Sequence, residues 1–168
     1  LKRLVQTVAD TVGKPLDQCR VLDLAWLEGH YGIAFALHGA QAVCVEIREA
    51  NLAKAAYAID ALGLSNCELV QDDVRNLDVA TYGRFDVIIC SGILYHLRAE
   101  DAARLVRQMA DCCTRLCIVD TYIAVRETAH ATRGAVRAEA VDESRVDDAE
   151  EQLVRDGDQR VHDQRVVE

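Results

Sequence analysis

Residues 21–32 read VLDLAWLEGHYG, which is a short apolar strand with one acid in it, a loop, a glycine and the start of a helix. A strand that turns tightly into a helix brings backbone N–H groups and a helix N-terminus to one spot. Nucleotide-like ligands bind at such spots. The stretch therefore predicts a fold in which strands and helices alternate, with a ligand site at the end of this strand.

The alternation continues along the chain. Apolar runs predict strands at 20–25, 42–47, 67–71, 84–92 and 115–123. Helical spacing of apolar residues predicts helices at 1–12, 30–38, 52–62 and 102–113. Strands that are apolar on both faces indicate a parallel sheet covered on each side by helices. The predicted fold class is therefore α/β, a doubly wound and mostly parallel sheet that binds ligands at the carboxyl ends of its strands.

Acidic residues stand at two of these strand ends. Asp23 lies in the apolar first strand, where an unpaired carboxylate is costly, so we expect it to accept from loop N–H groups or a ligand amine. Glu46 ends the second strand, 17 residues after Gly29, close to the spacing at which an acid binds ribose hydroxyls in dinucleotide folds. The alternative for Glu46 is a solvated acid in a loop.

The third and fourth strands also end in polar or small residues. Asp72 and Asp73 follow the third strand, and Ser91 and Gly92 follow Cys90 in the fourth. An acid after a strand often only caps the next helix. We expect one of the two aspartates to be such a cap and the other to contact a ligand. Four consecutive strand ends thus predict one site.

The composition changes near residue 124. Residues 1–124 contain all eight aromatic residues, with 16 acidic and 12 basic side chains, whereas residues 125–168 contain 12 acidic residues, 7 Arg and no Lys, Ile, Phe, Tyr or Trp. So few large apolar side chains do not offset the entropy lost on ordering the backbone. We predict a ligand-binding domain at 1–124 and a polar acidic tail at 125–168, as loose helix or disorder.

The net charge of −9 disfavours non-specific binding to nucleic acid, although a local basic patch stays open. No apolar run reaches the roughly 18–20 residues of a membrane span, and no cleavable leader is visible, so we expect a cytoplasmic protein with no membrane contact.

The chain begins at Leu1 rather than Met, so we expect it to be a piece of a longer protein. The oligomeric state stays open.

The seven cysteines predict core packing rather than disulfides. Their number is odd, and Cys44 and Cys90 lie in apolar runs, where Cys behaves as a small hydrophobic residue. The closer group of Cys112, Cys113 and Cys117 lacks the geometry and the fourth ligand of a tetrahedral site. We therefore expect no metal.

The stretches that carry the strand-end residues resemble one protein family when they are taken in order. They read VLDLAWLEGHYG, VCVEIREANLAKA, LVQDDVRNL and FDVIICSGILYHL. Residues 1–124 resemble the class I S-adenosylmethionine-dependent methyltransferases, from the leading helix through the fifth strand. The resemblance implies a Rossmann-like fold, S-adenosylmethionine as the cofactor, and methyl transfer to an acceptor.

The resemblance also implies a set of cofactor-binding residues, which are Asp23, Ala25, Gly29, Glu46, Asp73, Val74, Ser91 and Gly92. Asp23 would lie near the methionine ammonium, and Glu46 would bind the ribose hydroxyls. Asp73 would read the adenine together with the Val74 backbone. Tyr95 and His96 would face the acceptor as catalytic residues, with His96 as the base and Tyr95 orienting the acceptor. The alternative is that both only begin the link to the next helix.

Two features depart from the family. Its usual acid-x-Gly-x-Gly-x-Gly loop reads Asp23-x-Ala25-x-Leu27-x-Gly29 here, so only the last glycine is present. The family's sixth strand and antiparallel seventh strand have no match after Tyr122, so we expect a sheet that lacks both. We expect the missing strands to affect catalysis more than cofactor binding.

The leading hypothesis is an S-adenosylmethionine-dependent methyltransferase that acts on an unidentified small-molecule acceptor. A truncated or inactive cofactor-binding domain without turnover is the first alternative. A tRNA-modifying transferase is the second, which the acidic balance disfavours. A nucleotide-binding oxidoreductase is the third, and it is disfavoured because Ala25 and Leu27 occupy glycine positions that a pyrophosphate needs for close approach.

Overall fold

The computed structural model describes residues 1–25 and 29–122. Its strands are β1 (Arg20–Leu24), β2 (Gln41–Glu46), β3 (Cys67–Gln71), β4 (Phe85–Ser91) and β5 (Cys113–Asp120). Its α-helices are α1 (Lys2–Val12), α2 (His30–Leu37), α3 (Glu49–Ala61), α4 (Val79–Tyr82) and α5 (Ala99–Cys112), and its 3-10 turns are η1 (Leu16–Gln18), η2 (Val74–Asn76) and η3 (Leu94–His96). The tail predicted at 125–168, and any sixth or seventh strand after Tyr122, lie outside the described residues.

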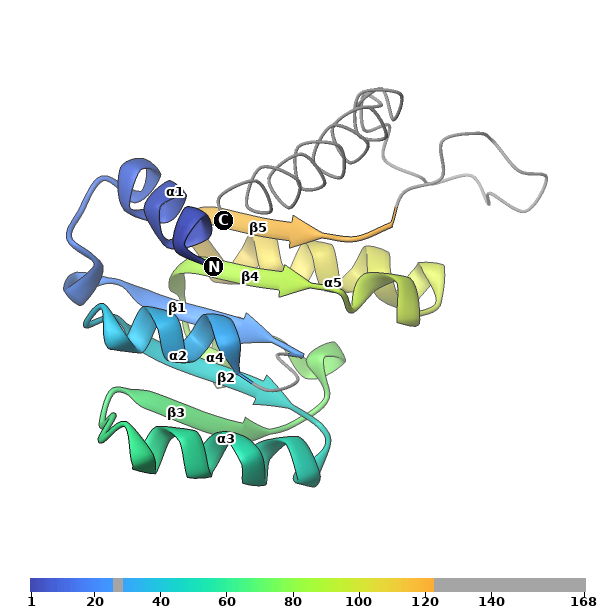
Figure 1. The fold of residues 1–168 in the computed structure, drawn as a ribbon. Coiled ribbons are helices and arrows are strands. Elements are labelled where there is room, and N and C mark those ends of the chain that lie inside the picture. The colour runs from blue at the N-terminus through green and yellow to red at the C-terminus, as the bar shows by residue number, and fades with distance from the viewer. Residues whose placement is uncertain (26–28, 123–168) are drawn as a thin grey trace, which may run out of the picture. The chain divides into compact units, whose positions relative to one another are not determined.

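The five strands form one parallel sheet in the order β3-β2-β1-β4-β5, and their arrowheads all point the same way in Figure 1. Helices α1, α2 and α3 pack on one face, and α4 and α5 pack on the other. The predicted doubly wound α/β fold is confirmed. Because the strand order reverses between β1 and β4, a ligand crevice is expected at the carboxyl ends of these two strands.

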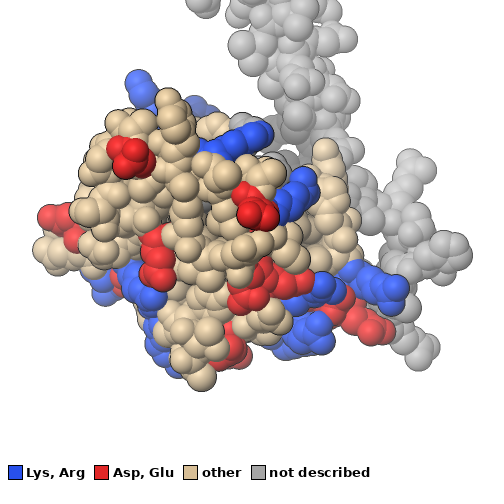
Figure 2. Space-filling view, turned by 90° about the horizontal axis from the view of Figure 1, so that it is seen from below, with Lys and Arg blue, Asp and Glu red and all other residues tan. Residues whose placement is uncertain are grey.

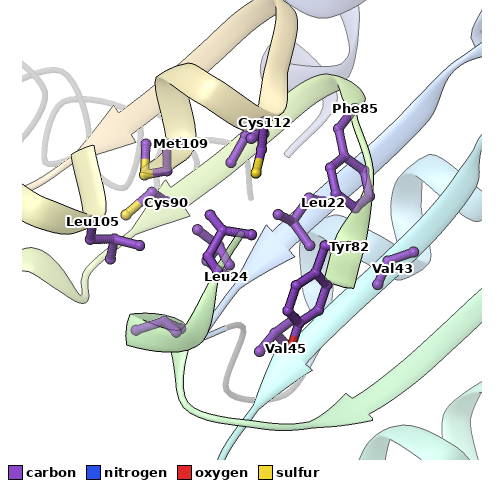
Figure 3. Close-up of a cluster of buried hydrophobic side chains, with 13 residues drawn as sticks. Leu22, Leu24, Val43, Val45, Tyr82, Phe85, Cys90, Leu105, Met109 and Cys112 are labelled. Atoms are coloured by element: carbon purple, nitrogen blue, oxygen red, sulfur yellow. The ribbon is translucent and has the colours of Figure 1, made fainter. Parts of the chain in front are cut away.

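The core has one layer of apolar side chains on each side of the sheet. On one side Leu105, Met109 and Cys112 of α5 face Leu22 and Leu24 of β1 (Figure 3). On the other side α1 packs its buried valines against β1, β4 and α2; these are Val5, Val8 and Val12. The predicted core positions of Cys44 and Cys90 are confirmed, whereas the expected packing of Cys117 was wrong, because this residue is exposed. All seven cysteines are free thiols.

The expectation that every strand is covered on both faces was wrong for the two outer strands. The outer strands β3 and β5 are only partly buried, whereas β1, β2 and β4 are buried along most of their length. Within the described sheet β3 and β5 each have one neighbouring strand, so less of their surface is covered.

Gly32 lies in the first turn of α2, packed directly against β1 and β2. A Cβ atom at this position would lie 2.3 Å from Cys44 Sγ and 3.5 Å from Asp23 Oδ2. Cys44 is 0% exposed on β2, so its sulfur has little room to move. The close contact of α2 with β1 and β2 therefore requires a residue without a side chain at position 32.

We expect Gly32→Ala to lower the free energy of unfolding by about 2–3 kcal/mol, which is common for an overpacked core. Urea unfolding followed by circular dichroism measures the change. Adding Cys44→Ala removes the sulfur and should make the double variant more stable than Gly32→Ala alone. A double variant that is no more stable would show that the clash with Cys44 is not the cause.

Candidate functional site

A cleft of about 570 Å³ opens at the carboxyl ends of the strands. Its volume is in the range of roughly 300–1,000 Å³ that is usual for small-molecule sites. It is lined by eight of the predicted site residues, which are Ala25, Glu46, Asp73, Val74, Ser91, Gly92, Tyr95 and His96. The remaining two, Asp23 and Gly29, are not among the lining residues. The strand ends thus bring most of the predicted residues to one place.

Asp23 lies in β1 with its side chain covered by α2, and it is 1% exposed. Its Oδ2 accepts a 2.9 Å hydrogen bond from the Gly32 N–H, as expected for a buried acid, although the donor lies in α2. Burial raises the pKa of Asp23 to about 7, and the Gly32 N–H only partly offsets this rise. This carboxyl group therefore changes its charge near neutral pH and is ionised more readily when a cation lies nearby.

Glu46 is the second buried acid, with 4% of its surface exposed at the end of β2. Its Oε1 accepts a 2.9 Å hydrogen bond from the Arg48 N–H, which fixes the carboxylate at the edge of the cleft. The alternative of a solvated loop acid is wrong, because the side chain is almost completely covered. A fixed carboxylate facing a cleft can accept hydrogen bonds from a diol.

The turn after β1 has the backbone conformation that favours glycine. Ala25 has φ 54° and is the one residue other than glycine with positive φ in the described ranges. This conformation costs roughly 1–2 kcal/mol for a residue with a Cβ atom, which explains a glycine at this position in the family that the chain resembles. The Ala25 N–H donates to Val45 O at 2.8 Å and ties the turn to β2. Gly29, with φ 84°, directly precedes α2.

Both aspartates after β3 have partners in the protein, unlike the expected division into a cap and a ligand contact. Asp72 accepts from the Tyr82 hydroxyl at 2.5 Å and from the Asn76 amide at 2.7 Å, and these bonds lower its pKa. Asp73 caps η2 by accepting from the Arg75 N–H and also pairs with the Arg75 guanidinium, which lowers the pKa of Asp73. Asp73 is thus both the cap and a residue of the cleft.

The ends of β4 and β5 are joined through Asp120. Ser91 Oγ donates to Asp120 Oδ2 at 3.1 Å, and the Gly92 N–H donates to Asp120 O at 2.9 Å. Asp120 lines the cleft but was not predicted, although it ends the fifth strand just as the other site residues end theirs. Arg48 and Arg75 were missed as well, and no local pattern distinguishes them from other surface arginines.

Three aromatic rings gather beside the cleft. Tyr95 lies in η3, with its ring centroid 4.3 Å from that of His96 and 4.7 Å from that of Tyr122. Tyr95 is 45% and Tyr122 81% exposed, and His96 is exposed too. Exposed rings of this kind can pack against an apolar or planar part of a ligand. Tyr122 was not predicted.

The signs of the surface charges are mixed. Figure 2 shows Lys and Arg next to Asp and Glu on the face seen from below. In residues 1–25 and 29–122, no group of three or more His, Cys, Asp or Glu could hold a metal ion. None of the described helices is long and apolar enough to span a bilayer.

Residues 21–115 match a family described as methyltransferase domain. Among solved structures, the N-terminal domain of EvdMO1 with SAH bound is 34% identical, with a TM-score of 0.59 over 68% of this chain and 46% of that one. The same domain was also solved in the presence of SAH and D-fucose. SAH is S-adenosylhomocysteine, the demethylated form of S-adenosylmethionine.

Magnesium protoporphyrin IX methyltransferase from Synechocystis PCC 6803 with bound SAM is 26% identical, with a TM-score of 0.59 over 70% of this chain and 54% of that one. The chain therefore spans about half the length of these two structures. No curated protein sequence matches this chain.

Proposed function

Because the chain belongs to the methyltransferase-domain family, we propose that it binds S-adenosylmethionine in the cleft and transfers the methyl group to a small-molecule acceptor. The observation that carries the proposal is Glu46, a buried carboxylate fixed by the Arg48 N–H at a strand end that faces the cleft. A buried acid is costly unless it is bonded, and a ribose diol supplies two donors.

The other residues of the cleft fit the same cofactor. Asp73 with the Val74 N–H would contact the adenine, and Ser91 with Gly92 would lie beside the methionine part. Asp23 does not line the cleft, so we propose that its charge, rather than direct contact, favours the ammonium group. The bound cofactor supplies an activated methyl group, so the protein mainly orients the acceptor and excludes water.

The acceptor would lie beside the aromatic residues. His96 would take the proton of an acceptor hydroxyl or amine, and the Tyr95 hydroxyl would orient it. Asp120, fixed by Ser91, lies on the same cleft and is a second candidate to hold the acceptor. The protein solved with D-fucose and the one named for protoporphyrin support a small molecule. The net charge of −9 gives an RNA acceptor no comparable support.

Binding of three ligands tests the proposal against its alternatives. Isothermal titration calorimetry of the full chain should show micromolar-order binding of S-adenosylmethionine and S-adenosylhomocysteine, which is common for small-ligand pockets. NAD should bind much more weakly, because the Ala25 side chain keeps a pyrophosphate from the backbone. Tight NAD binding without the other two would favour an oxidoreductase.

A turnover assay separates an active enzyme from a binding domain. Release of S-adenosylhomocysteine would be followed with a panel of hydroxylated small molecules, including sugars and phenols. Cofactor binding without release of S-adenosylhomocysteine for any acceptor would favour the inactive cofactor-binding domain.

We further propose that the protein is cytoplasmic and that the cofactor-binding domain ends at about residue 124.

A further inference from the structure

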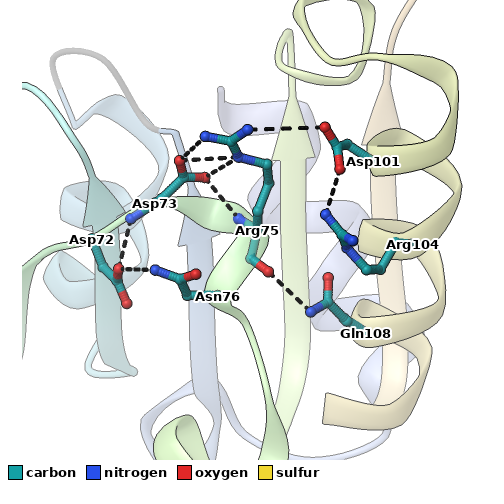
Figure 4. Close-up of polar contacts among 7 residues, drawn as sticks. All are labelled: Asp72, Asp73, Arg75, Asn76, Asp101, Arg104 and Gln108. Carbon is teal, nitrogen blue, oxygen red and sulfur yellow. Dashed lines mark hydrogen bonds and ion pairs between the residues drawn. The ribbon is translucent and has the colours of Figure 1, made fainter.

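The Asp73 carboxylate is bound through both of its oxygens by one neighbour, Arg75 (Figure 4). Its Oδ1 accepts from the Arg75 main-chain N–H at 3.0 Å and from Nε–H at 2.9 Å. Its Oδ2 accepts from Nε–H at 3.0 Å and from Nη2 at 2.5 Å. A carboxylate offers about four lone-pair positions. The single Nε hydrogen is shared between the two oxygens, so three N–H groups of Arg75 use most of this acceptor capacity.

The proposed function assigns the same carboxylate to the adenine. Asp73 and Arg75 both line the cleft, and the Arg75 side chain is 47% exposed. A 6-amino group on the purine needs a free lone pair on Asp73. The purine amino group and the Arg75 guanidinium therefore compete for one acceptor.

A second carboxylate lies within reach of the guanidinium. Asp101, in the first turn of α5, has its Oδ2 3.9 Å from Arg75 Nη1 (Figure 4). The main chain of Arg75 is held in place, because its carbonyl oxygen accepts from the Gln108 amide at 3.1 Å. The side chain can thus move from Asp73 to Asp101 while the turn that carries Asp73 stays fixed.

We propose that Arg75 determines the purine specificity of the cleft by competing with a 6-amino group for Asp73 and by moving to Asp101 when the cofactor binds. The proposal rests on the proposed function, since it requires an S-adenosyl ligand in this cleft. A guanidinium only donates hydrogen bonds, so Arg75 suits a 6-oxo group and opposes a 6-amino group. Arg75 therefore reduces the preference for adenine over hypoxanthine.

Calorimetry with two probes tests this. The full chain and its Arg75→Ala variant would be titrated with S-adenosylhomocysteine and with S-inosylhomocysteine, which has a 6-oxo group. Arg75→Ala should bind S-adenosylhomocysteine about two- to fivefold more tightly, since an exposed ion pair is a weak competitor. It should bind S-inosylhomocysteine no better, so the ratio of the two dissociation constants increases. The Arg75 N–H cap of Asp73 is retained in this variant.

Two further variants sharpen the test. Asp101→Asn removes the second partner of Arg75 and should weaken the binding of S-adenosylhomocysteine by about twofold. This change is opposite in direction to that of Arg75→Ala. Arg107→Ala is the matched control, because Arg107 is an exposed arginine on α5 that does not line the cleft, and it should leave the ratio unchanged. If Arg75→Ala weakens the binding of S-adenosylhomocysteine, or leaves the ratio of the two dissociation constants unchanged, the proposed competition for Asp73 is wrong. If the unsubstituted chain binds neither S-adenosyl ligand, the proposed function itself fails.

Discussion

The Asp23→Asn variant should gain about 2–3 kcal/mol of stability relative to the parent protein as the pH rises from 5 to 8, measured without ligand. Burial raises the pKa of Asp23 to about 7 in the folded chain, whereas an unfolded aspartate has a pKa of about 3.9. Between these two values the folded chain keeps a proton that the unfolded chain has released. The stability that this group contributes is therefore complete below about pH 4 and is lost as the pH rises through about 7.

Urea unfolding of both proteins across this pH range measures the effect. Asparagine retains the shape of the side chain and an oxygen that can accept from the Gly32 N–H. Asp86→Asn on the neighbouring strand β4 is the matched control. Burial opposes ionisation of Asp86, but hydrogen bonds from Lys14 and the Arg20 N–H hold its pKa below the ordinary value. The free energy of unfolding of Asp86→Asn should differ from that of the parent by a constant amount from pH 5 to 8. If the difference between Asp23→Asn and the parent is also constant over this range, the prediction is wrong.

Glu46→Ala should weaken the binding of S-adenosylhomocysteine by about 100-fold, because two hydrogen bonds from the ribose to a charged acceptor are lost. The buried position of Glu46 supports a large effect, since little water can replace the missing carboxylate. Calorimetric titration of the folded variant gives the dissociation constant directly. Circular dichroism checks that the variant, which also loses the bond to the Arg48 N–H, remains folded.

Two variants define the origin of that loss. Glu46→Gln retains one acceptor oxygen without the charge, so an intermediate loss of about tenfold is expected. Glu68→Ala removes an exposed acid from the neighbouring strand β3, outside the cleft, and should leave the affinity unchanged. An unchanged affinity in Glu46→Ala would remove this residue from the cofactor site.

The order of strands and helices could be predicted because apolar periodicity is a local property. The run CELVQ predicted β3 with its observed bounds, and the glycine at 13 ends α1 in a left-handed conformation, as a glycine readily does. Helix α4 was missed because its four residues are too few to show a helical period. The rule that ligands bind at the carboxyl ends of parallel strands placed Glu46 and Ser91 on the cleft.

The partners of the site residues could not be predicted in the same way. Asp73 binds Arg75 only two residues away, yet nothing in the sequence distinguishes this arrangement from a free carboxylate. Ser91 meets Asp120 from 29 positions along the chain, because β4 and β5 lie side by side in the sheet. Such contacts depend on strand order and register, which are set by packing of the whole domain.

The sequence by itself determined the alternation of strands and helices, the parallel sheet and the acids at the strand ends, because these follow from patterns between near neighbours. The tertiary structure decided how far the pKa of each acid departs from its ordinary value and which groups donate hydrogen bonds to it. Asp23 titrates near neutral pH because α2 covers it at Gly32, and Asp73 is engaged because η2 turns Arg75 back onto it. Burial and electrostatic environment come from residues that folding brings together, so only the folded chain defines them.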